Sequence, residues 1–241
     1  MSDSLVIIPT YNEKENIENM IRKVHSLSMS FHILIVDDGS PDGTADIVKK
    51  LQSEFPQSLH IQERKGKLGL GTAYIHGFKW GLEKGYEYIF EMDADFSHPV
   101  DKLPELYAAC AKDGYDFSIG SRYVKGGGVS NWDKKRLFLS QAASLYSRMI
   151  LWITVKDTTA GFMCYSRKVL ETMDLDGVKF IGYAFQIEMK YTAIRLGFKP
   201  KEVPITFKDR EFGTSKMDVS IIKEAVFGVL KLRFKKIRKA K

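Results

Sequence analysis

The chain has 241 residues, of which 44% are hydrophobic and 28% charged, enough for one large domain with its own core. Its net charge of +7 lies at the end of the chain: the last eleven residues contain seven Lys and Arg and no acid, and the remainder holds 30 basic and 30 acidic residues. This neutral body argues against nucleic acid as a partner, because a nucleic-acid-binding fold carries its basic face itself.

The first half of the chain alternates between strand and helix patterns. Short apolar runs such as 5–8 and 33–36 are typical of parallel strands covered on both faces. The segments between the runs carry apolar residues at helical spacing. This alternation predicts an α/β fold with a mostly parallel central sheet flanked by helices. In chain order, the expected elements are 5–8, 14–27, 33–36, 44–55, 59–63, 72–84, 88–93, 101–112 and 116–121.

The second half of the chain is less regular. A glycine-rich loop at 126–128 precedes an amphipathic helix, and a short strand, a second helix and a further strand follow. A polar loop then leads to a last helix that runs into the basic tail. We therefore expect a main domain over residues 1–217 and a C-terminal amphipathic helix with a basic tail over 218–241. The elements predicted after the glycine-rich loop are 133–153, 162–165, 184–197, 202–207 and the polar loop 208–217.

The start of the chain and its hydropathy predict neither export nor a membrane span. Met1, Ser2 and Asp3 run straight into an apolar strand, so we expect no secretory signal. No window of about 18 uninterrupted apolar residues predicts a transmembrane helix.

Polar residues gather where the predicted parallel strands end. Because ligands of such sheets bind beyond the carboxyl ends of the strands, these residues are expected to form one site. They are Tyr11 and Glu13 after the first strand, Asp37 and Asp38 after the second, Asp93 and Asp95 after the fourth, and Ser121 and Arg122 after the fifth.

Asp93 and Asp95 suggest a metal site. Two carboxylates this close repel each other unless a cation lies between them. Mg²⁺ and Mn²⁺ prefer oxygen ligands and use one or two carboxylates together with substrate phosphates. A solvated acidic turn is the alternative for an isolated DxD sequence. A phosphatase of the haloacid-dehalogenase type also uses DxD, but near the start of its fold, and here two strand–helix units come first.

Other recognised motifs fit poorly. A P-loop-like glycine stretch has Thr72 in place of the lysine, and Tyr74 replaces the third glycine of a dinucleotide-binding motif. The histidines show no ligand spacing, although His98 is close enough to the two carboxylates to support them. Cys110 and Cys164 lie outside any CxxC or Cys/His cluster. We expect two buried free thiols in a reducing cytosol and no zinc site.

The segments at the strand ends carry a resemblance to a known family. PTYNE (9–13), VDDGSPDGT (36–44), GLGTAYIHGF (69–78), MDADFSHP (92–99) and GSRY (120–123) resemble family 2 glycosyltransferases of the GT-A fold. The resemblance narrows to the dolichol-phosphate (polyprenol monophosphate) mannose synthases through later segments. These are GGVSNWDKKR (127–136), DTTAGFMCY (157–165), GYAFQIEM (182–189) and EVPITFKDREFGTSK (202–216). It covers nearly the whole chain, from Leu5 to beyond Lys216.

The resemblance implies an inverting transferase that moves mannose from GDP-mannose to a polyprenyl phosphate, with Mg²⁺ or Mn²⁺ as cofactor. It implies that the nucleotide sugar is bound by Pro9, Tyr11, Glu13, Val36, Asp38, Asp93, Ala94, Asp95, Arg122, Arg210 and Lys216. Among these, it implies catalytic roles for Asp95, Arg122, Arg210 and Lys216.

The resemblance also implies a metal site and an acceptor site. Asp93, Asp95 and Ser97 would bind the metal and Arg136 the acceptor phosphate. The alternative for Arg136, and for Arg210 and Lys216, is a surface salt bridge. One subtype of the family carries Gln at the position of Ser97, so the shorter hydroxyl is expected to act directly or through a bridging water. Asp157 has two open interpretations: it orients the sugar or the acceptor, or it caps a helix.

The lipid acceptor implies a membrane surface. Apolar residues at helical spacing in the last helix, followed by the basic tail, are typical of a segment that lies on an anionic bilayer. A core-packing helix with a solvated basic end is the alternative. We expect a peripheral enzyme on the cytoplasmic face of a membrane. Some single-domain relatives depend on small membrane-embedded subunits, which is an open alternative here.

Two further functions stay open at this level. One is a glycosyltransferase that uses UDP-glucose or UDP-N-acetylglucosamine with a polyprenyl phosphate, because guanine and uracil are distinguished by few contacts. The other is a non-catalytic nucleotide-sugar-binding subunit.

Overall fold

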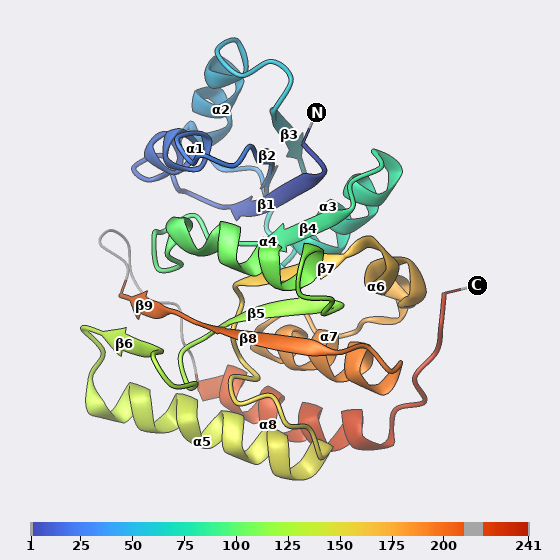
Figure 1. Cartoon of the computed structure of the whole chain (residues 1–241). Coiled ribbons are helices and arrows are strands. Elements are labelled where there is room, and N and C mark those ends of the chain that lie inside the picture. The colour runs from blue at the N-terminus through green and yellow to red at the C-terminus, as the bar shows by residue number, and fades with distance from the viewer. Residues whose placement is uncertain (1, 210–218, 241) are drawn as a thin grey trace.

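A seven-stranded sheet forms the centre of the molecule (Figure 1). It is seen in a computed structural model that describes residues 2–209 and 219–240, except for the side chains of Tyr183 and 219–226. The strand order is β3-β2-β1-β4-β7-β5-β8. The strands are β1 (Ser4–Thr10), β2 (His32–Asp37), β3 (Leu59–Glu63), β4 (Tyr88–Glu91), β5 (Phe117–Ser121), β7 (Met163–Ser166) and β8 (Pro200–Pro204).

The sheet is mostly parallel, as predicted. β7 is the exception, because it pairs antiparallel with both β4 and β5 and separates them. The other neighbouring strands pair in parallel. The carboxyl ends of β1, β2, β4 and β5 therefore lie along the same edge of the sheet.

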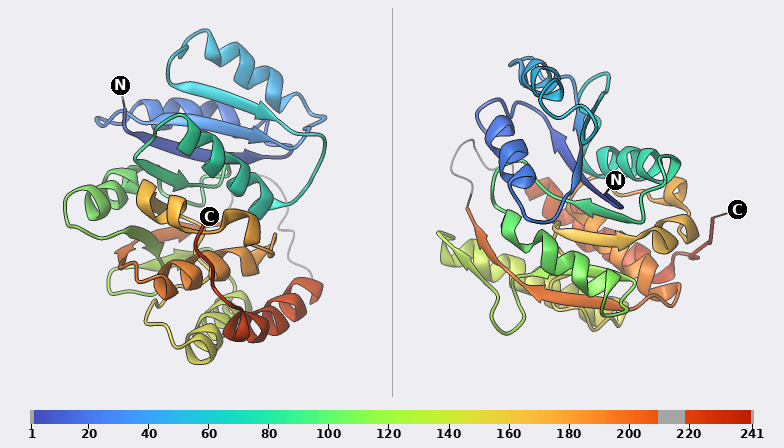
Figure 2. Two further views of the ribbon diagram at one scale, coloured as in Figure 1. Left: turned by 90° about the vertical axis from the view of Figure 1, so that its right-hand side faces the viewer. Right: turned by 45° about the horizontal axis from the view of Figure 1, so that its top comes forward.

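Helices cover both faces of the sheet (Figure 2). Along β1, Val6 and Ile8 pack with α1, α2 and α4, whereas Leu5 and Ile7 pack with α3, α6 and α7. This two-sided burial explains the continuous apolar run of the strand. The described helices and 3-10 turns are α1 (Ile17–His25), α2 (Thr44–Gln52), α3 (Leu70–Glu83), η1 (Val100–Lys102), α4 (Leu103–Ala111), α5 (Lys134–Leu151), α6 (Arg167–Thr172), η2 (Leu175–Gly177), α7 (Tyr183–Arg195) and α8 (Val219–Phe234).

Two short strands and one short helix differ from the prediction. The strand expected at 202–207 is divided: β8 ends at Pro204, and β9 (Thr206–Lys208) pairs with β6 (Gly128–Ser130), which was expected to be loop. The helix α6 was not predicted. Strands of three residues contain too little alternation to be recognised from sequence. Cys110 and Cys164 are buried and free, as predicted.

The last described part of the chain packs against the body. The helix α8 lies beside α5 (Figure 1), and its residues Val229 and Leu232 are buried with residues of α5 and α7. Farther on, Ala240 N donates to Thr172 O at 2.9 Å, and Lys239 forms a bridge with Met173. Among the described residues, no helix is both long enough and apolar enough to cross a membrane.

Candidate active site

The loops after β1 and β2 are locked together by short polar side chains. Thr10 Oγ1 and Ser40 Oγ both donate to Asp37 Oδ2, at 2.8 and 2.6 Å. Asn12 N donates to Ser40 Oγ at 3.0 Å, and Asn12 adopts a left-handed φ of 60°. Asp37 therefore shapes the two loops. Their geometry brings together the residues expected at the nucleotide, since Pro9 and Val36 are register partners and Tyr11, Glu13 and Asp38 follow them.

Asp38 is held by an arginine that the sequence did not single out. Arg64 Nε donates to Asp38 Oδ1 at 2.7 Å, and Leu68 N donates to Asp38 Oδ2 at 3.2 Å. Lys67, in the same segment, lies with its ammonium 5.0 Å from the centroid of the Tyr11 ring. The basic loop 64–67 is thus a third wall beside the ends of β1 and β2. The Lys and Arg residues clustered at 64–67, next to the glycines at 66–71, are a sequence signal that could have identified this loop.

Asp93 and Asp95 follow β4, just before a sharp turn at Phe96. Tyr74 OH donates to Asp93 Oδ1 at 3.2 Å, and Ser97 N donates to Asp95 Oδ1 at 3.1 Å. Phe96, directly after Asp95, has φ 59°, in the left-handed region that a bulky residue adopts at a cost. Ala94 is buried behind the turn. The two carboxylates therefore sit at the same strand end, as the sequence predicted.

The residues at this turn fit a divalent metal bound together with phosphates. The buried Ser97 Oγ has no hydrogen-bond partner within the part of the chain that the structure describes. An orphaned oxygen beside two carboxylates is the donor type that Mg²⁺ and Mn²⁺ prefer. The described residues contain no group of three or more His, Cys, Asp or Glu side chains suited to a metal. Asp93, Asp95 and Ser97 offer few donors to such an ion, and Mg²⁺ commonly combines one or two carboxylates with substrate phosphates.

His98 supports the turn from behind. Its Nδ1 accepts a hydrogen bond from Asp93 N at 3.0 Å, and its ring stacks on Phe162 with centroids 5.1 Å apart. Burial lowers the pKa of His98, so the ring is neutral at pH 7 and Nε2 carries the proton. The position agrees with the supporting role considered from sequence.

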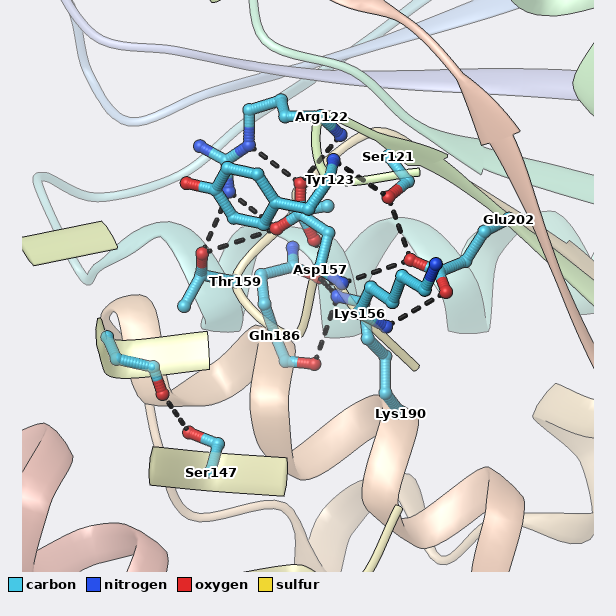
Figure 3. Close-up of polar contacts among 12 residues, drawn as sticks. Ser121, Arg122, Tyr123, Ser147, Lys156, Asp157, Thr159, Gln186, Lys190 and Glu202 are labelled. Atoms are coloured by element: carbon cyan, nitrogen blue, oxygen red, sulfur yellow. Dashed lines mark hydrogen bonds and ion pairs between the residues drawn. The ribbon is translucent and has the colours of Figure 1, made fainter. Parts of the chain in front are cut away.

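Arg122 is fixed by Asp157, a buried carboxylate 35 residues later (Figure 3). Arg122 Nε donates to Asp157 Oδ2 at 2.7 Å and Nη2 donates to Oδ1 at 2.6 Å. The backbone N–H of Arg122 also donates to Oδ2 at 2.9 Å, and Nη2 reaches Thr159 Oγ1 at 2.8 Å. Asp157 begins no helix, so the helix-capping interpretation is wrong. Its role is to orient Arg122.

A polar network behind Asp157 fixes the loop that carries it (Figure 3). Glu202 Oε1 accepts from Ser121 Oγ at 2.7 Å and from Asp157 N at 3.0 Å. The fully buried Lys190 donates through Nζ to Ala160 O at 2.6 Å. Burial lowers the pKa of Lys190 to about 8. β8 and α7 thus hold the loop from both sides, a role that sequence analysis did not assign to them.

Arg136 lies in the first turn of α5, next to the small β6–β9 sheet. Its backbone N–H donates to the N-cap residue Asp133 at 2.8 Å. Its guanidinium binds Asp209, with Nη1 2.9 Å from both carboxylate oxygens, and lies against the Trp132 ring. Arg210 and Lys216, which the resemblance includes in the site, lie outside the described residues. The other described residues that the resemblance includes in the site lie at the carboxyl edge of the central sheet, and Arg136 lies beside them at the β6–β9 sheet.

Comparison with known proteins identifies close relatives over most of the chain. The family model of Glycosyl transferase family 2 matches residues 5–174. A polyprenol monophosphomannose synthase from Mycolicibacterium smegmatis is 50% identical over 226 residues, which cover 94% of this chain and 85% of the relative. An undecaprenyl-phosphate mannosyltransferase from Micrococcus luteus is 45% identical over 225 residues, covering 93% and 91%.

Solved structures share the fold at much lower identity. Glucosyl-3-phosphoglycerate synthase from Mycobacterium tuberculosis, in complex with Mn²⁺, UDP-glucose and phosphoglyceric acid, has a TM-score of 0.67 and 18% identity. The match covers 96% of this chain and 80% of that one. A mannosyltransferase from Pyrobaculum calidifontis, in complex with GDP-Man and Mn²⁺, has a TM-score of 0.59 and 15% identity, covering 95% and 69%. The predicted fold is therefore confirmed.

Proposed function

The chain belongs to glycosyl transferase family 2, and we propose that it transfers mannose from GDP-mannose to a polyprenyl phosphate at a membrane surface. The observation that carries this proposal is the 50% identity, along nearly the whole chain, to a polyprenol monophosphomannose synthase. The arrangement at the carboxyl edge of the sheet adds independent support, because it combines a carboxylate pair with positively charged side chains suited to phosphates.

The guanosine of the donor is assigned to the loops after β1 and β2. Pro9, Tyr11 and Glu13 lie on one loop, and Val36 and Asp38 on the other. The carboxylate of Asp38 is held in place by Arg64, which leaves an oriented acceptor for N–H groups of a base. Mannose as the transferred sugar follows from the names of both curated relatives. GDP as its carrier is supported by the GDP-Man complex of the Pyrobaculum calidifontis structure.

Asp93 and Asp95 would hold Mg²⁺ or Mn²⁺, with Ser97 as a further oxygen ligand. When bound there, a divalent cation neutralises charge on the departing diphosphate. Solved neighbours with Mn²⁺ and nucleotide sugars are consistent with this assignment. Ala94 and Arg122 would flank the diphosphate, and Arg210 and Lys216 are proposed to complete its binding.

The reaction needs little from protein acids or bases. An oxygen of the acceptor phosphate, already ionised at neutral pH, forms a bond to the anomeric carbon of mannose. The bond from that carbon to the β-phosphate oxygen of GDP breaks, and the electron pair leaves with GDP, so the configuration inverts. The residues must bring two anions together and hold them in line. Arg122, aimed by Asp157, and Arg136 are proposed to serve the donor and acceptor phosphates respectively.

The acceptor is a lipid, and one face of the molecule suits a membrane surface. We call it the α5–α8 face and define it by seven exposed apolar residues: Phe138, Leu145, Met149 and Trp152 along α5 and at its end, and Phe227, Leu230 and Phe234 on α8. Trp152 is 80% exposed and Phe234 86%. Arg136 and Phe138 both lie near the N-terminal end of α5, so a lipid phosphate at Arg136 would lie close to that end of the α5–α8 face. The proposed location is the cytoplasmic side of a membrane, with a small membrane-embedded subunit as an open possibility.

A transfer assay tests the proposal. Purified protein is incubated with Mn²⁺ or Mg²⁺, a polyprenyl phosphate in detergent, and labelled GDP-mannose, UDP-glucose or UDP-N-acetylglucosamine in parallel. We expect label in the organic extract from GDP-mannose alone, and its loss in Asp95→Asn. Label from a UDP-sugar alone would overturn the donor. No label, together with metal-dependent thermal stabilisation by GDP, would favour a nucleotide-sugar-binding subunit that does not catalyse transfer.

A further inference from the structure

Trp132 lies between the two arginines assigned to the donor and the acceptor. The guanidinium carbon of Arg136 is 4.2 Å from the centroid of the Trp132 ring, and that of Arg122 is 5.4 Å away. Both distances are within the range at which a cation is attracted to an aromatic ring. One indole therefore contacts both proposed phosphate-binding cations, although they come from the end of β5 and the start of α5.

Charge explains why a ring is suited to this position. Two guanidinium groups placed side by side repel each other. Here each has its own carboxylate, Asp157 for Arg122 and Asp209 for Arg136. The ring contributes a negative π face to both cations without adding a formal charge. It can thus hold the two guanidinium groups near one another without adding a second negative charge to either Arg–Asp pair.

The ring is itself anchored to the metal-binding turn. Phe207 of β9 meets Trp132 edge-on at 5.3 Å and meets His98 edge-on at 5.6 Å. Lys208 N donates to Ser97 O at 3.3 Å. The β6–β9 sheet therefore ties Trp132 to the segment that contains Asp93 and Asp95. A displacement of the ring would change the position of Arg136 relative to both Arg122 and the metal-binding turn.

We propose that Trp132 is a positioning residue, whose ring sets the location of the acceptor-side Arg136 relative to the donor-side Arg122. The inference rests on the proposed function, because it takes Arg122 as a donor-phosphate contact and Arg136 as an acceptor-phosphate contact. In this role, the Trp132 ring aligns the acceptor phosphate with the donor. Donor binding depends on it little, since Asp157 and Thr159 already accept three hydrogen bonds from the Arg122 guanidinium.

The test compares Trp132→Leu, which removes the ring, with Trp132→Phe, which keeps one. For Trp132→Leu we expect a rise of about tenfold in KM for the polyprenyl phosphate and a fall of about tenfold in kcat, the size expected for misplaced reactants. KM for GDP-mannose and the affinity for GDP with Mn²⁺ should change less than about twofold. Trp132→Phe should recover most of the loss, because a smaller ring still attracts cations. Trp80→Leu is the matched control, since Trp80 also lies near a cation, Lys84, but outside the site.

Several outcomes would overturn the inference. An unchanged acceptor KM in Trp132→Leu would do so, as would an equal loss of GDP affinity. If Trp132→Phe were as impaired as Trp132→Leu, the indole N–H rather than the ring would carry the effect. Calorimetric titration of a short-chain polyprenyl phosphate into each variant bound to GDP and Mn²⁺ gives a readout independent of turnover. Parent protein that neither transfers mannose nor binds the lipid phosphate would refute the proposed function itself.

Discussion

At the scale of single residues, the site depends on charges that are paired before any ligand arrives. Arg122 and Asp157 are both buried, and each satisfies the other with two hydrogen bonds between their side chains. Such a pair contributes little net stability compared with an apolar one, but breaking it leaves an uncompensated charge in the interior. The guanidinium of Arg122 therefore keeps its orientation, because any other arrangement would leave a buried charge without its partner.

Replacing Asp157 with Asn tests this dependence. The substitution keeps the volume and removes the charge, so we expect the free energy of unfolding to fall by about 3–5 kcal/mol. Asp209→Asn is the matched control, because the Arg136–Asp209 pair is partly exposed, and its loss should cost roughly 1 kcal/mol or less. Urea denaturation of both variants measures the difference. Equal losses would contradict the buried-pair interpretation.

Lys190 provides a pH-dependent test of the network behind Asp157. Burial lowers its pKa from 10.5 to about 8, against the opposing charges of Glu91, Asp157 and Glu202. Between pH 8 and 10.5 the unfolded chain therefore binds more protons at this position than the folded one, so stability from this group rises with pH. We expect the parent to gain stability relative to Lys190→Met between pH 7.5 and pH 10. A stability difference that stays constant across this range would refute the shift.

Sequence could identify only some of these residues. Asp93, Asp95 and Arg122 follow apolar runs, so their place at the sheet edge was predictable. The positions of Asp157 and Arg64 in the site could not be predicted. Their partners are distant in the chain, and polar residues in loops follow no helical or strand periodicity. Buried partners of this kind are specified by tertiary packing, which a single sequence does not encode in any local pattern.

At the scale of elements, the sheet was predicted in type but not in order. The alternation of strands and helices indicated parallel pairing, and the strand near 162–165 was expected, but nothing local places β7 between β4 and β5. That insertion brings the loop with Asp157 next to Arg122 at the end of β5. The close packing of α3 against α7 was equally hidden, since it depends on glycines whose need is visible only in three dimensions.

Gly71 at the start of α3 shows this packing most clearly. A Cβ atom at this position would lie 2.7 Å from Phe185 Cδ2 and 2.9 Å from Phe180 O. We expect Gly71→Ala to lower the free energy of unfolding by about 1–3 kcal/mol, as overpacking does. Gly182→Ala is the control, because a Cβ there meets no atom within 4 Å and the backbone is not left-handed. Thermal unfolding of the two variants should differ clearly, and identical melting temperatures would refute the close packing.

At the scale of the whole molecule, the exposed apolar residues of α5 and α8 are joined to a basic tail that begins at the end of α8. The helices α5 and α8 lie at the bottom of Figure 1 and α1 and α2 at the top, and the chain after α8 rises along the right-hand side toward α6. The basic end is partly engaged, since Lys235 Nζ lies 2.5 Å from the buried Glu188 Oε1. Lys236, Arg238 and Lys239 remain exposed. The proposed membrane contact would use the exposed apolar residues of α5 and α8 together with these basic residues.

The exposed tail charges give a quantitative prediction for membrane binding. Each Lys or Arg near an anionic surface contributes about 1 kcal/mol, so replacing three of them with Gln should weaken binding to vesicles containing phosphatidylserine on the order of a hundredfold. The tail variant changes Lys236, Arg238 and Lys239, and the control changes the exposed residues Lys23, Lys49 and Lys50 of α1 and α2. Both variants remove three positive charges from exposed surface, and Lys49 of the control also loses its surface ion pair with Glu63.

Vesicle flotation separates the contributions of charge and apolar contact. Raising the salt concentration should weaken binding of the parent and the control variant, but change the tail variant less, because screening acts on charges that it has lost. Phe138→Ser combined with Trp152→Ser should weaken binding at every salt concentration, since it removes apolar contact, which salt does not screen. Equal vesicle binding by the tail variant and the control variant would contradict the prediction that the basic residues after α8 meet the membrane.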